Sequence, residues 1–340
     1  MRFSAAACLA FLVAACGGTN MMTIEPTTYV PFDEPSYQAA RAPLDFYTKV
    51  RALSSATDFS KLSFGTFDVD MSSTPAARCA PKAAPAANTM AAVFLVGDAC
   101  NKVVTRIEPH AYGAGAGTSQ LGEVIHAGLV KGLQDGAAAT DDTALDVAQE
   151  RIKKQMLRYF YESIVEGTAR RSPSGWDQAF AHWGGDLDGT HPLGLALLAK
   201  GRDLKLKTTF ESDVFNLLLR GRKILAARKL TGNASLKPGD AVDLDETIAA
   251  IDSKLQLLFG HYSGGEFAGW TAKVADRSAI YVEGSVIAFA IADYMKTKNP
   301  SGHATLSAAL QKPESQFVEA DAKAIVQAIE ATFGIVVVAE

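Results

Sequence analysis

The sequence has little of what common catalytic sites are built from. Its 340 residues include only four cysteines and six histidines. It contains no CxxC pair, HExxH helix, P-loop or GxSxG elbow, so the usual zinc, nucleotide and serine-hydrolase signatures are absent. No run of lysine and arginine forms a stripe that follows a polyanion, which argues against a nucleic-acid partner. These absences favour a binding or accessory protein over an enzyme.

Long hydrophobic runs are also scarce. Beyond the first 15 residues no stretch reaches the roughly 20 apolar residues that a membrane span needs. At the N-terminus, Arg2 precedes an apolar stretch from Ala5 to Val13 that is too short to cross a bilayer. This pattern predicts a secretory signal peptide over residues 1–15.

The run Val13-Ala14-Ala15-Cys16 resembles the bacterial lipobox. The resemblance implies cleavage before Cys16, diacylglyceryl transfer to its thiol and acylation of the new amine. Two or more acyl chains give stable anchoring, so the membrane is the first expected partner. No aspartate follows Cys16, which favours the outer membrane of a Gram-negative envelope. An ordinary secretory signal that happens to contain a cysteine is the alternative.

The remaining cysteines support an envelope location. Cys8 leaves with the signal and Cys16 takes the lipid, so Cys79 and Cys100 stay in a compartment where disulfides persist. A bridge between them would close a loop of roughly 20 residues and contribute about 3 kcal/mol in the chain-entropy view. A two-thiolate metal site is the rival, but no histidine stands beside either cysteine.

The charge balance is that of an ordinary soluble domain. Loss of Arg2 with the signal lowers the basic count from 33 to 32, against 37 acidic residues, for a formal charge of −5. One basic cluster stands out, and we interpret it as the solvated face of a helix. It comprises Arg220, Arg222, Lys223, Arg228 and Lys229.

Hydrophobic periodicity predicts a mainly α-helical domain over 36–340, preceded by an extended tether over 16–35 that contains three prolines. A small irregular or β-containing segment is expected near 57–110, with strands suggested over 62–69 and 92–96. The helical period predicts helices over 36–56, from 119 onward, and over 144–168, 172–183, 210–230, 244–259, 276–297 and 316–333. Such helices joined by short loops make a bundle.

Several short motifs occur in an order that resembles a group of uncharacterised bacterial lipoproteins, distantly similar to the imelysin-like periplasmic proteins. The motifs are Tyr29-Val30-Pro31-Phe32, the helix start from Ser36 to Leu44, Gly128-Leu129-Val130-Lys131-Gly132, Trp176-Asp177-Gln178-Ala179-Phe180 and Glu283-Gly284-Ser285-Val286-Ile287. The resemblance covers most of 27–335. It implies an imelysin-like bundle of two packed helical halves and a setting in iron or haem acquisition.

This chain departs from those relatives at one point. They commonly carry a GxHxxE motif that is thought to bind metal. The nearest segment here, from Gly122 to His126, has no acidic residue three positions after the histidine. The departure puts an inherited metallopeptidase activity in doubt.

The best candidate for chemistry is the stretch from His182 to His191. It holds His182, Asp186, Asp188 and His191 on a glycine-rich turn after a predicted helix. Mixed nitrogen and oxygen ligands suit a divalent metal ion such as zinc, iron or manganese. Alternatively, the aspartates only cap and turn the chain, and His182 lies on the helix beside Trp183.

His261 and Glu266 lie in a second stretch that could approach the first, although a structural loop is the stronger interpretation there. Trp176, Phe180 and Trp183 follow helical spacing and are expected in the core.

These observations predict a lipid-anchored envelope protein that acts as a binding or accessory component, with an envelope protein as a further partner. The first alternative is a metal-dependent hydrolase centred on 182–191. The second is a structural scaffold lipoprotein without a small-molecule ligand.

Overall fold

The computed structural model describes residues 28–61, 121–230, 236–270 and 272–339, and every regular element in these ranges is a helix. The mainly α-helical prediction is therefore confirmed for the described chain. The predicted signal peptide and Cys16 lie outside the described residues. So do Cys79, Cys100 and the strands expected over 62–69 and 92–96.

The helix predicted over 36–56 is two helices. Helix α1 spans Glu34–Arg51 and α2 spans Ala56–Lys61. The second helix begins at a reciprocal cap, in which the Asp58 amide donates to the Ser55 hydroxyl at 3.2 Å and that hydroxyl donates to the Asp58 carboxylate at 2.8 Å. This local cap starts a new helix after the chain has left α1.

The tether predicted over 16–35 ends sooner than expected. The Tyr29 side chain is fully buried, and its hydroxyl donates to Asp177 at 2.8 Å. The other Asp177 oxygen accepts from the backbone amides of Phe32 and Asp33, at 2.8 and 2.9 Å. We name this arrangement of Tyr29, Phe32, Asp33 and Asp177 the N-terminal clasp. Because of it, the folded part begins before residue 36.

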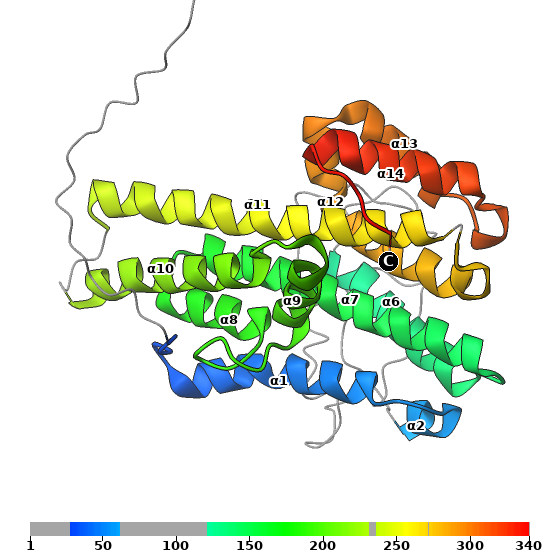
Figure 1. Cartoon of the computed structure of the whole chain (residues 1–340). Coiled ribbons are helices and arrows are strands. Elements are labelled where there is room, and N and C mark those ends of the chain that lie inside the picture. The colour runs from blue at the N-terminus through cyan, green and yellow to red at the C-terminus, as the bar shows by residue number, and fades with distance from the viewer. Residues whose placement is uncertain (1–27, 62–120, 231–235, 271, 340) are drawn as a thin grey trace, which may run out of the picture.

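Helix α7 occupies the middle of the bundle (Figure 1). It spans Asp142–Ala169 and begins at Asp141, whose side chain accepts from the Ala144 amide at 2.8 Å. It packs against α1, α6, α8, α9, α11 and α12. The first-half neighbours are α6 (Leu121–Ala137), α8 (Pro173–Trp183), α9 (Gly194–Leu206) and α10 (Phe210–Leu230).

The second half of the chain adds the long helix α11, which runs beside α10, α12 and α14 (Figure 1). The bounds are Pro238–Gly269 for α11, Arg277–Lys298 for α12, Pro300–Leu310 for α13 and Glu319–Phe333 for α14. Single 3-10 turns lie at Val274–Asp276 and Glu314–Gln316. One described stretch, Val274–Lys298, has the length and hydropathy of a membrane span. Of its most apolar part, 67% is buried inside the bundle, as in a core helix.

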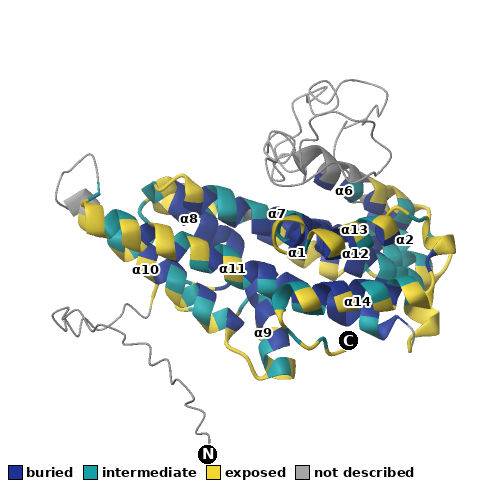
Figure 2. Cartoon of the chain, turned by 90° about the horizontal axis from the view of Figure 1, so that it is seen from above, coloured by how far each residue is buried: buried dark blue, intermediate teal, exposed yellow. Residues whose placement is uncertain are grey.

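Two helix boundaries follow the sequence signals. Ser172 caps α8 by accepting from the Gly175 amide at 3.2 Å, and Gly334 ends α14 in a left-handed conformation with φ of 65°. The predicted stripe of Trp176, Phe180 and Trp183 is buried, which confirms its place in the core. Seen from above, buried residues face the interior and exposed ones cover the outside (Figure 2).

Candidate functional site

The histidine at the start of the predicted metal site lies in the core. His182 is fully buried in the last turn of α8. Its ring stacks on Phe160 with 5.9 Å between centroids, and meets the Tyr159 ring edge-on at 5.4 Å. The side chain packs like an aromatic core residue, which is the structural alternative that the sequence left open.

The other three predicted ligands form local contacts on the surface. His191 Nδ1 lies 2.9 Å from an Asp186 carboxylate oxygen, and both side chains are exposed. Asp188 accepts from the backbone amide and the hydroxyl of Thr190, as a turn-forming aspartate does. In the part of the chain that the structure describes, no three potential metal ligands come together. The structure therefore does not unite the four residues.

The second predicted loop is not a loop. Residues 261–266 lie within α11, so His261 and Glu266 stand on a continuous helix. His261 meets the Phe210 ring edge-on at 5.8 Å, and burial, followed by the charge of Arg202, lowers its pKa. Glu266 is 5% exposed and belongs to a different polar region, in the middle of the bundle.

That region begins on α7. Apolar residues repeat every four positions along this helix in one stripe, and all of them are fully buried: Ile152, Met156, Phe160 and Ile164. However, helices surround α7 on several sides, so polar residues outside the stripe are buried as well. Lys154 is one of these, at 7% exposed.

Lys154 lies between two carboxylates, those of Glu150 and Glu283. Its ammonium is 2.9 Å from Glu150 on the same helix and 2.7 Å from Glu283 on α12. The Tyr262 hydroxyl on α11 donates to the same Glu283 oxygen at 2.5 Å. Lys153 forms a further ion pair with Glu150. We name these five residues, Glu150, Lys153, Lys154, Tyr262 and Glu283, the central network.

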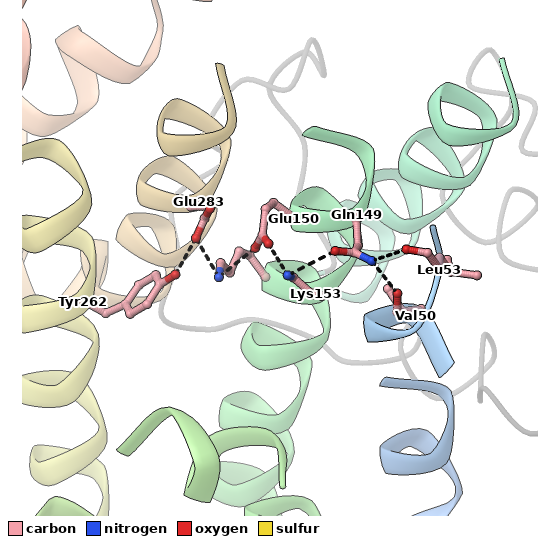
Figure 3. Close-up of polar contacts among 8 residues, drawn as sticks. Val50, Leu53, Gln149, Glu150, Lys153, Tyr262 and Glu283 are labelled. Atoms are coloured by element: carbon pink, nitrogen blue, oxygen red, sulfur yellow. Dashed lines mark hydrogen bonds and ion pairs between the residues drawn. The ribbon is translucent and has the colours of Figure 1, made fainter. Parts of the chain in front are cut away.

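The network also reaches α1 (Figure 3). Lys153 donates to the Gln149 side chain at 3.4 Å, and that side chain donates to the carbonyls of Val50 and Leu53 at 3.0 and 2.8 Å. Val50 lies in the last turn of α1 and Leu53 just beyond its end, so the Gln149 bonds fasten the C-terminal end of α1 to α7. The polar contacts thus join α1, α7, α11 and α12.

Electrostatics keep the network ionised. Burial alone would lower the pKa of the Lys154 ammonium, but Tyr262, Glu150 and Glu283 together raise it well above its usual value. Burial opposes ionisation of Glu150 too, yet the charges of Lys154 and Lys153 hold its pKa below the ordinary value. Each buried charge therefore has an opposite charge beside it, as stability requires.

A cavity lies on each side of this network. The basic pocket has a volume of about 310 Å³, and the acidic pocket about 470 Å³. The basic pocket is lined by Tyr47, Arg51, Lys153, Lys154, Leu157, Leu197, Leu198, Gly201, Arg202, Lys205 and Tyr262. The acidic pocket is lined by Thr143, Asp146, Glu150, Glu266, Lys273, Ala275, Asp276, Ala279, Ile280 and Glu283.

In the basic pocket, two cations lie over one aromatic ring. The Arg202 guanidinium is 4.6 Å and the Lys154 ammonium 4.7 Å from the centroid of the Tyr262 ring. Arg202 is 2% exposed, and its burial lowers its pKa. Burial and the charge of Arg202 also lower the pKa of Lys205. Concentrated positive charge of this kind attracts an anion.

In the acidic pocket, Glu266 is the perturbed group. Burial, followed by the negative charge of Glu283, raises its pKa to about 7. In the sequence, Glu266 stands in the second predicted loop and Glu283 in one of the motifs that carry the family resemblance. A charged residue inside each of two otherwise apolar and glycine-rich helical stretches is the signal that could have linked them.

No family model, curated protein or solved structure matches this chain. The imelysin-like resemblance, with its two packed halves, therefore stays a prediction. The basic and the acidic pocket are the features of the described chain that bear on ligand binding.

Proposed function

We propose that this protein is a lipid-anchored envelope binding protein that holds a small multivalent anion in the basic pocket. The observation that supports the proposal is the composition of that pocket. Five cationic side chains line it, and no carboxylate does so among the described residues. They are Arg51, Lys153, Lys154, Arg202 and Lys205.

The lining of the basic pocket carries positive charge alone among the described residues. Glu150 and Glu283 form the ion pairs of the central network with Lys153 and Lys154. Arg51, Arg202 and Lys205 add three further cationic side chains to the pocket wall. An arginine with a rigid, planar guanidinium suits a carboxylate or phosphate group, which it contacts with two parallel hydrogen bonds.

The size and walls of the pocket favour a compact ligand. About 310 Å³ is at the lower end of the range for small-molecule sites. Rings of Tyr47 and Tyr262 and the side chains of Leu197 and Leu198 supply apolar contact beside the charges. A di- or tricarboxylate, or a phosphorylated small molecule, combines these properties.

The lining of the basic pocket bears on which iron compound the protein would bind in the proposed iron or haem acquisition. Of the side chains that ligate haem iron, the basic pocket offers tyrosine alone, and neither pocket is lined by a histidine, cysteine or methionine of the described chain. An anionic iron chelate fits the basic pocket better than haem does. Metal hydrolysis at 182–191 gains no support, because His182 packs in the core away from a shared site.

The test is calorimetric titration of the mature chain with citrate and with inorganic phosphate at low ionic strength. We expect binding by at least one, and Arg202→Gln should weaken it at least about tenfold. Lys205→Gln, an exposed change that spares the core, should weaken it less. Arg220→Gln is the matched control, since Arg220 faces Asp243 at 3.8 Å on the exposed surface of α10.

Two results would count against anion binding. One is the absence of a titration heat with a folded chain. The other is equal affinity in the parent and in both pocket variants. Either result would favour the scaffold alternative.

The anchor is a separate part of the proposal. If Cys16 carries the lipid, Cys16→Ser should abolish labelling with radioactive palmitate and release the chain from the membrane fraction. Continued labelling of that variant would contradict anchoring at this residue, whatever the pocket binds.

A further inference from the structure

The cavity on the other side of the central network carries the opposite charge. We propose that the acidic pocket binds an organic ammonium ion, of the class of linear aliphatic diamines. This inference does not depend on the anion proposal, because different residues and a different ligand are involved.

Glu266 is the buried acid of the acidic pocket. Its side chain is 5% exposed and lies on the wall of the 470 Å³ cavity. Burial and the charge of Glu283 raise its pKa to about 7, and they outweigh Lys154, Arg202 and a hydrogen bond with Tyr262, which favour its charged form. The Tyr262 hydroxyl also donates to Glu283. A cation that enters the cavity beside Glu266 would supply the compensation that the carboxylate still lacks.

The charges around the acidic pocket determine whether it attracts a cation or an anion. Asp146 and Glu150 face the cavity from α7, Glu283 from α12, and Asp276 from the turn before it, while Lys273 is the one cation on the lining. Lys153 and Lys154 already offset Glu150 and Glu283. Asp146, Glu266 and Asp276 therefore exceed the single charge of Lys273, so the pocket favours a cation.

The shape of the site favours an organic cation over a bare metal ion. No three acidic or histidine side chains of the described chain are close enough together to hold a metal. The lining includes Ile280, Ala275 and Ala279, which can contact methylene groups. One ammonium of a diamine would meet the buried Glu266, and the other would reach the exposed carboxylates of Asp146 and Asp276.

The test is titration of the mature chain with 1,4-diaminobutane at pH 7.5 and low salt. We expect binding in the parent, and Glu266→Gln should weaken it at least about tenfold, since it removes a charge-assisted contact and keeps the shape. The matched control is Glu319→Gln, because Glu319 is an exposed acid on α14 that pairs with Lys323. The control should bind as the parent does.

The pH dependence of the diamine affinity distinguishes binding by Glu266 from a purely structural role, which would leave that dependence unchanged. Glu266 faces Glu283, Tyr262, Lys154, Arg202 and Lys205, and it gains a proton as the pH falls through about 7. The diamine stays doubly charged over this range. Affinity in the parent should therefore fall between pH 8 and pH 6, with proton release on binding. The fall should be smaller in Glu266→Gln.

Three outcomes would overturn the inference. The first is no binding to a folded chain at pH 7.5. The second is equal affinity in the parent and Glu266→Gln. The third is full displacement of the diamine by an equal concentration of magnesium chloride, which would show nonspecific charge screening.

Discussion

The N-terminal clasp and the central network both bury charged side chains, but different neighbours surround those charges. At the clasp, Asp177 is 1% exposed and accepts three hydrogen bonds from the Tyr29–Asp33 segment. The Tyr29 ring stacks on Phe180 with 3.7 Å between centroids, so aromatic rings close the region. At the central network, Lys154 is equally enclosed by partners, yet a cavity lies on each side.

The difference suggests two uses for buried charge. In the clasp, each carboxylate oxygen is committed to a fixed donor, so the region serves to hold one segment in place. In the central network, the ion pairs form the wall between two pockets of opposite charge, so a ligand in either pocket changes the field at Lys154. Four variants test this contrast, and the expected effect decreases from each one to the next.

Removing the central cation should have the largest effect. Lys154→Met leaves Glu150 and Glu283 facing each other inside the bundle without the charge between them. We expect a loss of about 3–5 kcal/mol of unfolding free energy, measured by urea denaturation. Lys131→Met, which removes an exposed pair with Asp135, is the control and should change little. A loss no greater than that of the control would contradict the importance of the network.

Removing the charge of Glu266 should change how stability depends on pH. Its pKa is raised from an ordinary 4.5 to about 7 by burial and by Glu283, so the folded chain holds the proton more tightly than the unfolded chain. Stability from this group is therefore present below pH 4.5 and is lost as the pH rises through 7, by about 3 kcal/mol. In Glu266→Gln this loss should disappear. If the unfolding free energy depends on pH in the same way in the parent and in Glu266→Gln, the pKa of Glu266 is not raised.

Disrupting the N-terminal clasp should lower the unfolding free energy less than disrupting the central network. Asp177→Ala leaves the buried Tyr29 hydroxyl and two backbone amides without their acceptor, which we expect to cost about 1–3 kcal/mol. Asp177→Asn keeps an acceptor and should be milder. Limited proteolysis should cut the alanine variant near residue 30 while the rest of the bundle persists. Uniform loss of the whole bundle would mean that the clasp is part of the global core.

The surface pair of the 182–191 turn should matter least. His191 and Asp186 are exposed, so His191→Ala should leave the midpoint of thermal unfolding unchanged. Zinc titrations of the parent and the variant should be indistinguishable. A zinc-dependent rise in the midpoint that His191→Ala abolishes would restore the metal hypothesis.

The helices were largely predictable because their signals are local. Ser172 and Gly334 mark two boundaries, and the stripe on α7 was visible as a repeat of apolar residues. The pockets were not predictable, because Glu150, Tyr262 and Glu283 come together only when α7, α11 and α12 pack. The opposite holds at 182–191, where residues that are close in the sequence suggested a metal site but are separated in the fold. Helix α8 turns His182 into the core, whereas the glycines after it carry Asp186 and His191 to the surface.

The clasp also has a mechanical consequence for an anchored protein. If Cys16 carries the lipid, as we propose, only 13 residues separate it from Tyr29, which is held to α8 through Asp177, and 13 residues span at most about 45 Å. Tension from the membrane would then act on the side of α8 first and would not pull α1 away from its end.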